Sequence, residues 1–558
     1  MDVGEKQKSI SQMATMDQSL KFHNLYDLIY HPSWLETAYQ HVRRNAGSKT
    51  AGVDKVNMLM FEENLESNLQ ELREQLKSGT FDPLPVRRVI LEEKKRDGRI
   101  KLRPLGIPAI RDRIVQEALR MILEPIWESD FSTYSYGFRP NRCTMDAVSY
   151  LWAKMIGHAG WAYKWVIEGD ISSYFDTIHH RKLMKLVQRR IKEKKLLDLI
   201  WKFLQAGVLD GCNYTETLAG VPQGGIVSPL LANIYLHELD KYMEDTYVSR
   251  PQIVKHRNRK KGISNFLYTR YADDFVVLCD GNKAQAQEMK EELSQFLKSS
   301  LKLELSREKT KITHVTDGFQ FLGFWLERSM GTTGKIVGKI RIPESAIQKM
   351  RHKLHTVLSP STNQESVSAK IMALNRMIGG WCRYYQYTSS PSYVFGIMEN
   401  LIFWGMAHWI GRKYKLSTPK VLRKFRRSNT FAYKKSILIM PSAYKAKRYK
   451  QRTWKNPYLV NPKELRREIV PSLNDPGIYE ARPGRADMRS EVLERKGTVC
   501  SVCGKEYLEF EVQIDHIKPY ASFKRGEEAN RMGNLQVLCT SCHRAKTKKD
   551  RRVLSRVR

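Results

Sequence analysis

The spacing of hydrophobic positions changes along the chain, and each change predicts a different kind of element. Residues 33–78 show helical spacing on both sides of a basic, glycine-containing loop at 45–55. From 81 to 107 apolar and basic residues alternate around the turn Arg96-Asp-Gly-Arg99, which predicts an antiparallel hairpin. Helical spacing returns over 111–127. The amino-terminal part therefore combines helices with a hairpin whose charged face suits a phosphate backbone.

Acidic residues interrupt the apolar pattern at two places. Asp273 and Asp274 stand inside an apolar run rich in β-branched and aromatic residues, where aspartate is normally excluded. The run predicts two short strands that meet at a turn around this pair. Asp170 ends a second strand-like run about a hundred residues earlier and precedes a predicted short helix. Like charges in a half-buried setting are costly unless a cation or hydrogen bonds compensate them.

The string Tyr271-Ala-Asp-Asp274 by itself admits two interpretations. It is a plain polar turn of a β-hairpin, or it is a divalent-metal site at the tip of that hairpin, with oxygen ligands suited to magnesium. If Asp170 and Asp273 converge, two magnesium ions can be held between them and a nucleoside triphosphate. One ion then activates a 3′-hydroxyl and the other stabilises the leaving pyrophosphate, with Asp274 in support.

The composition points to a nucleic-acid partner. With 95 Lys and Arg against 59 Asp and Glu, the 558-residue chain carries a formal charge of +36. This excess favours binding to a polyanion, with a generic basic protein as the alternative. Between residues 411 and 470, 19 basic residues stand against two acidic ones and alternate with Tyr, Phe and Trp. The interleaving suits a nucleic-acid face, and a solvated basic helix is the alternative.

Length and apolar windows bound the organisation of the chain. The length predicts about three or four domains, and residues 471–484, rich in proline and glycine, predict a linker. The amino terminus has no apolar core of signal-peptide length, which favours the cytoplasm of a bacterium or an organelle. The most apolar window, 393–410, is interrupted by Glu399 and Asn400 and predicts a packed helix. Beyond Leu326, strands are expected to give way to helices.

Two loops combine residues that suit nucleic acid with equally plain structural roles. Residues 134–142 mix tyrosine, phenylalanine and arginine, which either stack on bases or pack the loop. Residues 219–235 contain glycines that permit close backbone approach before a helix that begins near Ser228. There Gln223 would supply a polar contact to a nucleotide or template strand. A plain turn before a core helix is the alternative for this second loop.

Ordered blocks of the chain resemble those of a group II intron reverse transcriptase. The similarity runs from about residue 30 to about residue 420, which makes chance agreement negligible. Two early blocks, Arg103–Pro108 and Tyr136–Pro140, resemble its fingers. The later blocks are Asp170–Asp176, Gly220–Gly225, Tyr271–Asp274, Leu305–Lys311 and Gly318–Gly323.

The resemblance implies a right-hand polymerase with fingers and palm over residues 81–330. The palm would carry Asp170, Asp273 and Asp274 as catalytic carboxylates, with magnesium as the metal. By the same resemblance, Ile171 would offer its backbone carbonyl to the metal. The interpretation of the aspartate pair as a plain turn then loses its support.

The resemblance also implies nucleotide-binding residues. Phe175 is expected to pack beneath the sugar and to disfavour a 2′-hydroxyl, while Gln223 contacts the nucleotide. Lys95 and Arg103 are expected to reach the triphosphate. Lys309 either acts near the leaving pyrophosphate or forms a structural ion pair, and the sequence leaves both roles open.

Outside the polymerase, the resemblance implies four further regions. An amino-terminal RNA-binding extension covers 1–80, and an α-helical thumb, or maturase domain X, covers 331–430. That domain grips intron RNA and promotes its splicing through phosphate contacts and shape recognition. A basic DNA-binding segment and linker occupy 431–490, and a separate domain occupies 491–558.

The last region carries a strong metal-binding pattern. Two Cys-x-x-Cys pairs about 36 residues apart have the spacing of one tetrahedral structural zinc site. Four thiolates fill the coordination shell, so this metal is not expected to be catalytic. Clustered cysteines of this kind favour a cytosolic metal site over a disulfide framework. The four ligands are Cys500, Cys503, Cys539 and Cys542.

Polar residues around these cysteines resemble an HNH endonuclease of the ββα-metal type, a domain that commonly closes group II intron proteins. The resemblance implies His516 as the general base for water, and Asp515 and His543 as ligands of a divalent ion, expected to be magnesium. Asn534 would orient the base or strap the loop. Many family members carry His-His where this chain carries Asp515-His516. A zinc ribbon that only binds DNA is the alternative, but it does not need these residues.

The sequence therefore predicts an α+β multidomain protein with a right-hand reverse transcriptase, an α-helical thumb, a basic DNA-binding segment and an HNH domain with a four-cysteine zinc knuckle. Its expected function is RNA-directed DNA synthesis, maturase activity and DNA nicking, combined in target-primed reverse transcription. Expected partners are intron RNA, target DNA and deoxynucleoside triphosphates, with no membrane. The alternative is a splicing-only RNA chaperone, but retention of every metal-binding carboxylate favours the enzyme.

Overall fold

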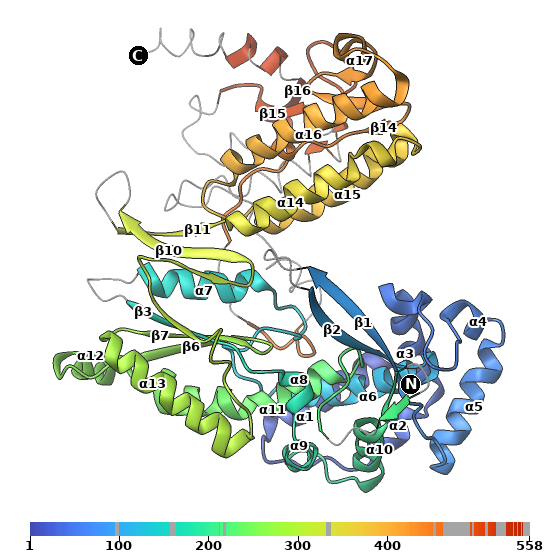
Figure 1. The fold of residues 1–558 in the computed structure, drawn as a ribbon, viewed down its shortest axis with the longest axis vertical. Coiled ribbons are helices and arrows are strands. Elements are labelled where there is room, and N and C mark those ends of the chain that lie inside the picture. Colours follow the sequence, from blue (N-terminus) through green and yellow to red (C-terminus); the bar gives the residue numbers. More distant parts are fainter. Residues whose placement is uncertain are drawn as a thin grey trace. The chain divides into compact units, whose positions relative to one another are not determined.

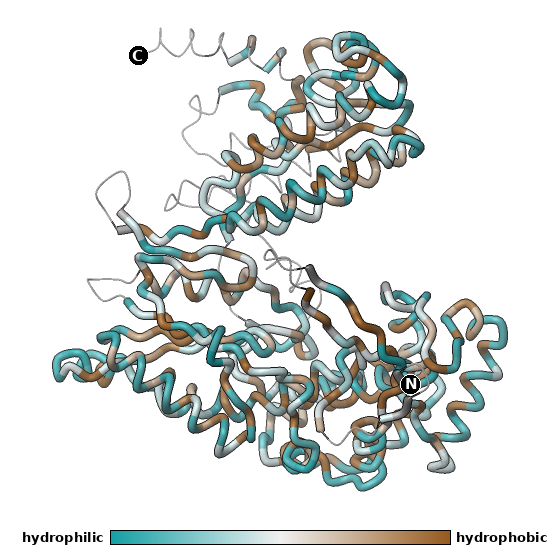
Figure 2. Tube along the Cα trace, in the orientation of Figure 1, coloured by the Kyte–Doolittle hydropathy of each residue, from teal (hydrophilic) through white to brown (hydrophobic). Residues whose placement is uncertain are grey.

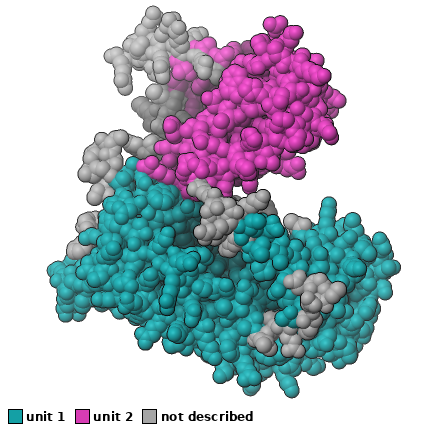
Figure 3. Space-filling model, viewed as in Figure 1, with its two compact units in different colours: residues 1–340, 451–469 teal, residues 341–450, 470–558 magenta. Residues whose placement is uncertain are grey.

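The computed structural model divides the chain into two compact units (Figure 3). Unit 1 comprises Met1–Ile340 with Gln451–Ile469, and unit 2 comprises Arg341–Lys450 with Val470–Arg558. Each unit has its own packed interior and is described by itself. The residues that the structure describes are 1–94, 100–156, 163–210, 213–215, 219–330, 336–449, 454–460, 492–493, 496–507, 512–519, 532–539, 541–543, 545–547 and 550.

Unit 1 begins with helices packed on one central helix, α6 (Ile110–Trp127), directly or through α3 (Figure 1). Nearly all of α6 is buried, so its polar residues find partners inside the fold. Arg120, for example, pairs with Glu117 and Glu124 at 2.7 and 2.6 Å. The predicted helical spacing over 33–78 and 111–127 is confirmed. The surrounding helices are α1 (Val3–Met16), α2 (Tyr26–Ile29), α3 (Pro32–Arg44), α4 (Met58–Glu62) and α5 (Leu65–Ser78).

The predicted hairpin forms part of a four-stranded fingers sheet, in the order β2-β1-β4-β5. Strands β1 (Val86–Lys94) and β2 (Ile100–Ile107) pair antiparallel, while the turn between them lies outside the described residues. The short strand β4 (Val208–Asp210) adds to β1 in parallel and is followed by β5 (Asn213–Thr215). Figure 2 shows apolar positions along this hairpin, which presents them to solvent beside its basic residues. The apolar side chains, each about half exposed, are Ile90, Leu91, Ile100 and Leu102.

The predicted palm region contains a four-stranded antiparallel sheet in the order β6-β7-β3-β8, which we call the palm sheet. Nearly every residue of β6 and β7 is buried, which explains why these strands appear in the sequence as continuous apolar runs rather than as alternation. The two predicted strands around the aspartate pair are confirmed. The strands are β3 (Trp165–Gly169), β6 (Phe266–Tyr271), β7 (Asp274–Cys279) and β8 (Lys311–His314), and the helices packed on them are α7 (Thr144–Ile156), α11 (Ser228–Met243) and α13 (Lys283–Phe296).

Strands continue further than the sequence pattern indicates. We expected helices beyond Leu326, but a three-stranded sheet in the order β11-β10-β9 extends to Arg341, and the first following helix begins at Glu344. Polar and glycine residues between β10 and β11 conceal the short alternation in the sequence. The strands are β9 (Phe319–Phe321), β10 (Phe324–Met330) and β11 (Ile336–Arg341). The remaining elements of unit 1 are η1 (Ala46–Lys49), α8 (Tyr174–Thr177), α9 (His180–Val187), α10 (Lys194–Gln205), η2 (Glu244–Val248), α12 (Gln252–Lys260) and η3 (Leu297–Leu301).

Unit 2 contains three long helices that pack on one another and a short helix with a small sheet of order β12-β13-β14. The apolar window 393–410 lies inside α16, whose buried side chains face its neighbours, so the predicted packed helix is confirmed. No helix in the described part of the chain is long and apolar enough to cross a bilayer. The helices are α14 (Glu344–Val357), η4 (Pro360–Thr362), α15 (Val367–Tyr385), α16 (Pro391–Tyr414), α17 (Thr418–Phe425), η5 (Pro441–Ala443) and η7 (Met532–Asn534), and the strands are β12 (Arg426–Arg427), β13 (Thr430–Tyr433), β14 (Ser436–Ile437), β15 (Val512–His516) and β16 (Leu535–Cys539).

Candidate active sites

Three aspartates meet at one end of the palm sheet. Tyr271 pairs with Asp274, so Ala272 and Asp273 form a two-residue connection between β6 and β7. The register of β3 against β7 pairs Gly169 with Phe275, and this places Asp170 next to Asp274 at the sheet end. The structure therefore brings together the three carboxylates that the sequence singled out, although Asp170 stands about a hundred residues before the other two.

Gly169 is the residue that lets the two strands meet in this way. A Cβ atom at this position would lie 2.2 Å from the ring of Phe275, a separation that real side chains essentially never show. The aromatic ring thus occupies the space that a side chain at this position would need. The glycine before Asp170 is therefore a steric requirement of the site.

A fully buried arginine supports the turn that carries Asp273. The guanidinium of Arg270 pairs with Asp240 at 2.5 Å, and both side chains are 0% exposed. The same guanidinium donates to the carbonyl of Ala272 at 2.8 Å and to Asn233 Oδ1 at 2.9 Å. Ala272 has φ +58°, a left-handed conformation that costs energy without glycine, so the arginine fixes a strained turn. The sequence analysis missed this support, and an arginine inside an apolar strand was the available signal.

The electrostatics of the three carboxylates favour a cation. Loss of hydration raises the pKa of Asp274 to about 6, and the charges of Asp273 and Asp170 act in the same direction, although part of the residue reaches solvent. Burial is likewise the main cause that raises the pKa of Asp273, with a further contribution from Asp170. Lys309 opposes both shifts. Such mutual repulsion is relieved when a metal ion binds between the groups.

Lys309 forms an ion pair with one of these carboxylates. Its Nζ atom lies 2.7 Å from Asp170 Oδ2, and its side chain is 58% exposed. The backbone of Asp170 is held as well, because its carbonyl accepts from the amide of Ser306 at 2.8 Å. The next residue, Ile171, is buried and forms a β-bridge with Leu305. The ion-pair role that the sequence left open for Lys309 is thus present in this structure.

The glycine-rich loop at 220–225 packs against the segment that carries Phe175. The amide of Val221 donates to the carbonyl of Phe175 at 2.7 Å, and a Cβ at Gly220 would lie 2.8 Å from that carbonyl oxygen. On its other side the loop meets β2, where the amide of Gly106 donates to the carbonyl of Gln223 at 2.7 Å. The loop is therefore fixed between the segment of Phe175 and β2, and its glycines allow close approach of protein backbone. Contact of this loop with a nucleotide or template strand stays a prediction.

Two of the predicted triphosphate-binding residues cannot be placed in the site. Lys95 lies outside the described residues. Arg103 is described by its backbone alone, which pairs with Leu91 in the fingers hairpin. Phe175 contacts Phe138, with ring centroids 6.3 Å apart and the rings nearly perpendicular. Phe138 itself has φ +58° and is 51% exposed, so an aromatic surface lies beside the sugar-binding candidate.

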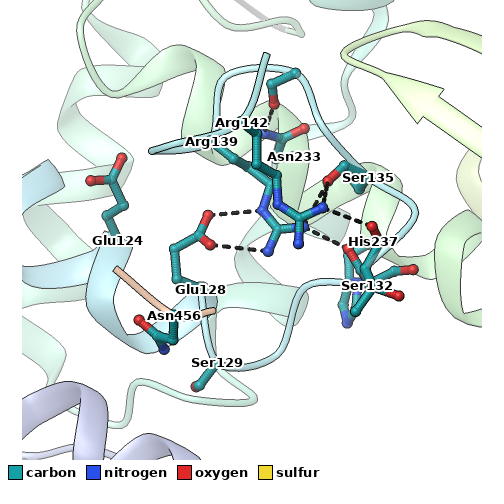
Figure 4. Close-up of polar contacts among 12 residues, drawn as sticks. Glu124, Glu128, Ser129, Ser132, Ser135, Arg139, Arg142, Asn233, His237 and Asn456 are labelled. Carbon is teal, nitrogen blue, oxygen red and sulfur yellow. Dashed lines mark hydrogen bonds and ion pairs between the residues drawn. The ribbon is translucent and has the colours of Figure 1, made fainter. Parts of the chain in front are cut away.

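In the loop between α6 and α7, Arg139 has a structural role. Arg139 is buried and pairs with Glu128 through Nε and Nη2 at 2.9 and 3.0 Å (Figure 4). Its Nη1 atom donates to the carbonyls of Ser132 and Ser135 at 2.6 and 2.8 Å. Of the two roles that the sequence left open for residues 134–142, Arg139 serves the packing of the loop. A buried arginine whose donors are satisfied by the protein in this way does not reach a base.

A metal-binding cluster lies in the carboxy-terminal part of unit 2. The Sγ atoms of the four predicted cysteines all lie within 4.8 Å of one another, and the edges of a tetrahedral zinc–thiolate site are about 3.8 Å. The amide of Cys500 donates to the carbonyl of Lys505 at 3.0 Å, and that of Gly504 donates back to Cys500 at 2.9 Å, which closes the first knuckle. Four sulfur donors at this separation fit Zn2+. The cluster consists of Cys500, Cys503, Cys539 and Cys542.

The predicted endonuclease residues surround a two-stranded sheet beside this cluster. Strands β15 and β16 are antiparallel, and Asp515 and His516 close β15. His543 Nε2 lies 3.9 Å from Asp515 Oδ1, so the two proposed metal ligands are neighbours. Asn534 accepts from the amide of Lys518 at 2.9 Å and donates to its carbonyl at 3.2 Å. These two hydrogen bonds hold the loop that follows His516. Holding this loop is one of the two roles predicted for Asn534.

A lysine that the sequence analysis did not select also contacts this site. Lys546 Nζ lies 3.1 Å from Asp515 Oδ2 and 2.5 Å from Asp550 Oδ2. Its spacing of three residues from His543 on a helix was a usable signal, because such residues share a helix face. Lys546 therefore forms an ion pair with Asp515, the carboxylate that is predicted to hold a divalent ion.

Comparisons with known proteins agree with this arrangement. The family described as reverse transcriptase (RNA-dependent DNA polymerase) matches residues 93–326, the group II intron maturase-specific domain matches residues 347–428, and HNH endonuclease matches residues 500–549. Protein YkfC of Escherichia coli K12 is 43% identical over 64% of this chain and 97% of its own length. Nuclear intron maturase 2, mitochondrial, of Arabidopsis thaliana is 25% identical over 57% of this chain and 55% of its own length.

One relative spans nearly the whole chain. The group II intron-encoded protein LtrA of Lactococcus lactis subsp. cremoris is 31% identical over 94% of this chain and 95% of its own length. The identity thus extends over the reverse transcriptase, maturase and HNH regions together, in the order that the sequence predicted. An enzyme with reverse transcriptase and endonuclease domains joined by a maturase domain, this chain belongs to the family of group II intron-encoded proteins.

Proposed function

We propose that this protein carries out target-primed reverse transcription of its intron RNA. It binds the RNA, helps it splice and brings it to DNA, where the HNH domain nicks one strand. The polymerase then copies the intron from the exposed 3′-hydroxyl. The observation that carries this proposal is the convergence of Asp170, Asp273 and Asp274 at one end of the palm sheet.

The polymerase site fits hard divalent cations. Carboxylate and carbonyl oxygens are the donors that Mg2+ prefers, and Asp170, Asp273 and the carbonyl of Ile171 would provide them. Bound Mg2+ would supply stabilisation of the charge that develops on the primer oxygen and on the pyrophosphate. Asp274 strengthens the negative field that attracts the cations. Lys309 leaves Asp170 when a cation takes its place and becomes free to pair with the leaving pyrophosphate.

The incoming nucleotide is recognised by residues of the palm and the fingers. Phe175 lies beneath the sugar and excludes a 2′-hydroxyl by steric contact, supported by its packing against Phe138. Gln223 presents a polar side chain from the loop fixed between palm and fingers. Arg103 and Lys95 contact the triphosphate from the hairpin, which brings positive charge to a tetra-anionic group.

The HNH site acts on DNA by metal-assisted hydrolysis. His516 would accept the proton of the attacking water, and Asp515 and His543 would hold a divalent ion, expected to be Mg2+, that would stabilise the charge developing on the phosphate. Asn534 keeps the loop after His516 in place through its two bonds to Lys518. The four-cysteine cluster holds structural zinc.

The remaining regions hold the nucleic acids. The extension 1–80 and the thumb 331–430 contact intron RNA, and the basic segment within 431–490 contacts target DNA, ahead of the HNH domain at 491–558. The net charge of +36 supplies the attraction, so binding is expected to weaken steeply with salt. Recognition of folded RNA then depends on phosphate contacts and shape.

The test compares two separate chemistries in one chain. Magnesium-dependent extension of a DNA primer on an RNA template is measured for the wild type, for Asp273→Asn/Asp274→Asn and for His516→Ala, together with nicking of target DNA. Loss of extension in the aspartate variant alone, and of nicking in the histidine variant alone, supports two active sites. A wild type that makes no cDNA but still promotes splicing would replace this proposal with the splicing-only chaperone.

A further inference from the structure

A segment that follows the thumb in sequence belongs to unit 1. Residues 341–450 belong to unit 2, but residues 451–469 belong again to unit 1. Of the latter, residues 454–460 are described, and we call them the return segment. The segment contains no helix or strand, so side-chain contacts to distant elements hold it in place.

Two of these contacts anchor the return segment to the helical part of unit 1. Asn456 Nδ2 donates to Ser11 Oγ in α1 at 3.0 Å. The hydroxyl of Tyr458 donates to Glu124 Oε2 in α6 at 2.5 Å. The partners lie more than 300 residues earlier in the chain, so these contacts report tertiary packing and not local structure.

A third contact, made by Trp454, reaches the loop between α6 and α7. The indole ring lies 5.0 Å from Arg139 Cζ and 4.4 Å from Arg142 Cζ, within the range of cation–π attraction. Both guanidinium groups are thereby held on one side by the same aromatic ring. Arg139 is also held by its ion pair with Glu128 (Figure 4).

The two arginines hold the backbone of that loop. Arg139 Nη1 donates to the carbonyls of Ser132 and Ser135, and Arg142 Nη1 donates to the carbonyls of Thr133 and Ser135 at 2.7 and 3.0 Å. Ser135 accepts from both side chains. Displacement of Arg139 would therefore remove its bond to the carbonyl of Ser132, displacement of Arg142 would remove its bond to that of Thr133, and either would leave Ser135 with one arginine donor instead of two.

This loop also contacts the turn that carries Asp273. The amide of Tyr136 donates to the carbonyl of Arg270 at 2.9 Å, and the amide of Arg270 donates to the carbonyl of Tyr134 at 2.9 Å. Gly137 approaches the turn so closely that a Cβ there would lie 2.3 Å from the amide nitrogen of Ala272. Ala272 immediately precedes Asp273 and carries the strained φ of the turn.

We propose that Trp454 is a positioning residue of the polymerase site. It acts through Arg139, Arg142 and the loop 132–142 on the turn that carries Asp273, without touching substrate or metal. Residues that follow the thumb thus set the geometry in which the palm carboxylates bind magnesium. The inference rests on the proposed polymerase site and adds to it a contribution from the segment before the HNH domain.

The test uses the full chain and three variants. Trp454→Ala removes the ring, Trp454→Phe keeps an aromatic face, and Asn456→Ala loosens the same segment at α1 without affecting the arginines. For each, primer extension is measured as a function of Mg2+ concentration, together with the melting temperature and DNA nicking. The half-saturating Mg2+ concentration does not depend on how much of the enzyme is folded, so it separates positioning from stability.

We expect Trp454→Ala to raise the half-saturating Mg2+ concentration about three- to tenfold and to lower kcat, as removal of outer supports of a metal site does. Trp454→Phe should keep the half-saturating Mg2+ concentration and kcat close to the wild-type values, and Asn456→Ala should leave the Mg2+ requirement unchanged. Nicking by the HNH domain stays at the wild-type rate. If Trp454→Ala does not fold, Trp454→Leu, which fills part of the space of the ring but offers no aromatic face to the two arginines, takes its place with the same direction of shift.

A different pattern overturns the inference. If the Mg2+ requirement of the ring-deletion variant stays within twofold of the wild type, while kcat falls only with the folded fraction, Trp454 is a stabilising contact and not a positioning residue. The wild type serves as the baseline for polymerase activity, so absence of cDNA synthesis in the wild type itself would point to failure of the proposed function instead.

Discussion

The ammonium group of Lys309 lies 2.7 Å from Asp170 Oδ2, so in this structure the lysine pairs with a carboxylate that we propose as a metal ligand of the polymerase. A cation that binds at Asp170 must displace this lysine. We therefore expect Lys309→Met to lower the Mg2+ concentration required for half-maximal primer extension by about two- to fivefold, the range of an exposed ion pair. Primer extension at a series of Mg2+ concentrations measures this half-saturating value for the wild type and the variant.

The same variant also tests the second role of Lys309. If the freed lysine assists the leaving pyrophosphate, kcat at saturating Mg2+ falls, whereas Lys309→Arg keeps part of it. An unchanged or higher Mg2+ requirement in Lys309→Met would show that the ion pair with Asp170 does not compete with metal.

Replacement of Gly169 by alanine is expected to abolish primer extension. The new Cβ would lie 2.2 Å from the Phe275 ring, so β3 and the following Asp170 must move. The overpacking should also destabilise unit 1 by about 1–3 kcal/mol. Equilibrium unfolding and primer extension measure both effects.

Gly380→Ala is the matched control for this prediction. An added Cβ there meets nothing within 4 Å, and the position lies inside α15. Alanine in a helix interior gains up to about 1 kcal/mol over glycine, so this variant should be as stable as the wild type or more so. Equal activity of the Gly169 and Gly380 variants would refute the steric argument.

The stability of unit 1 is expected to fall as the pH drops below 6.5, in part because of His237. Burial lowers the pKa of His237 to about 4, against 6.5 in an unfolded chain, and Arg270 acts in the same direction while Asp240 opposes it. The folded state therefore holds this imidazole neutral. Its contribution is complete above pH 6.5 and is lost as the pH falls from 6.5 toward 4, by about 1.4 kcal/mol for each unit of pKa difference.

The comparison with His237→Gln isolates this contribution from that of the carboxylates. Urea unfolding followed by tryptophan fluorescence at several pH values gives the free energy of unfolding of each protein. The gap between wild type and variant should shrink by about 2 kcal/mol or more between pH 7 and pH 4.5. A gap that is independent of pH would mean that the histidine is protonated in both states alike.

Removal of zinc is expected to abolish DNA nicking and to spare cDNA synthesis. The carboxy-terminal domain has only a small apolar core among its described residues, and the four-cysteine cluster adjoins the strands that carry Asp515 and His516. Small domains of this kind fold with their metal. Removal of zinc with a strong chelator, followed by removal of the chelator and addition of Mg2+, or the variant Cys503→Ser, should therefore lower the zinc content and nicking together. Loss of cDNA synthesis at the same time, with Mg2+ restored, would contradict separate domains.

Much of this protein's chemistry is determined by its sequence alone. The cysteine spacing predicts a zinc site directly, because few other roles need four cysteines at those intervals. The aspartate pair and the Asp515-His516 pair predict metal sites only together with the resemblance of the surrounding blocks to known families. The fingers hairpin and the helices over 33–78 follow from local periodicity, since burial of one face repeats with the period of the element. Local patterns of this kind can be recognised in the sequence without knowledge of the fold.

Other features were decided by tertiary structure alone. The pairing of Arg270 with Asp240, the packing of Arg139 against Glu128 and the contact of Lys309 with Asp170 join residues that lie 11 to 139 positions apart. The return segment joins residues more than 300 positions apart. The partners of a buried charge depend on which distant elements the fold brings together, and no local period encodes that choice. The sequence thus determined which groups are candidates for the chemistry, whereas long-range packing decided what holds them in position.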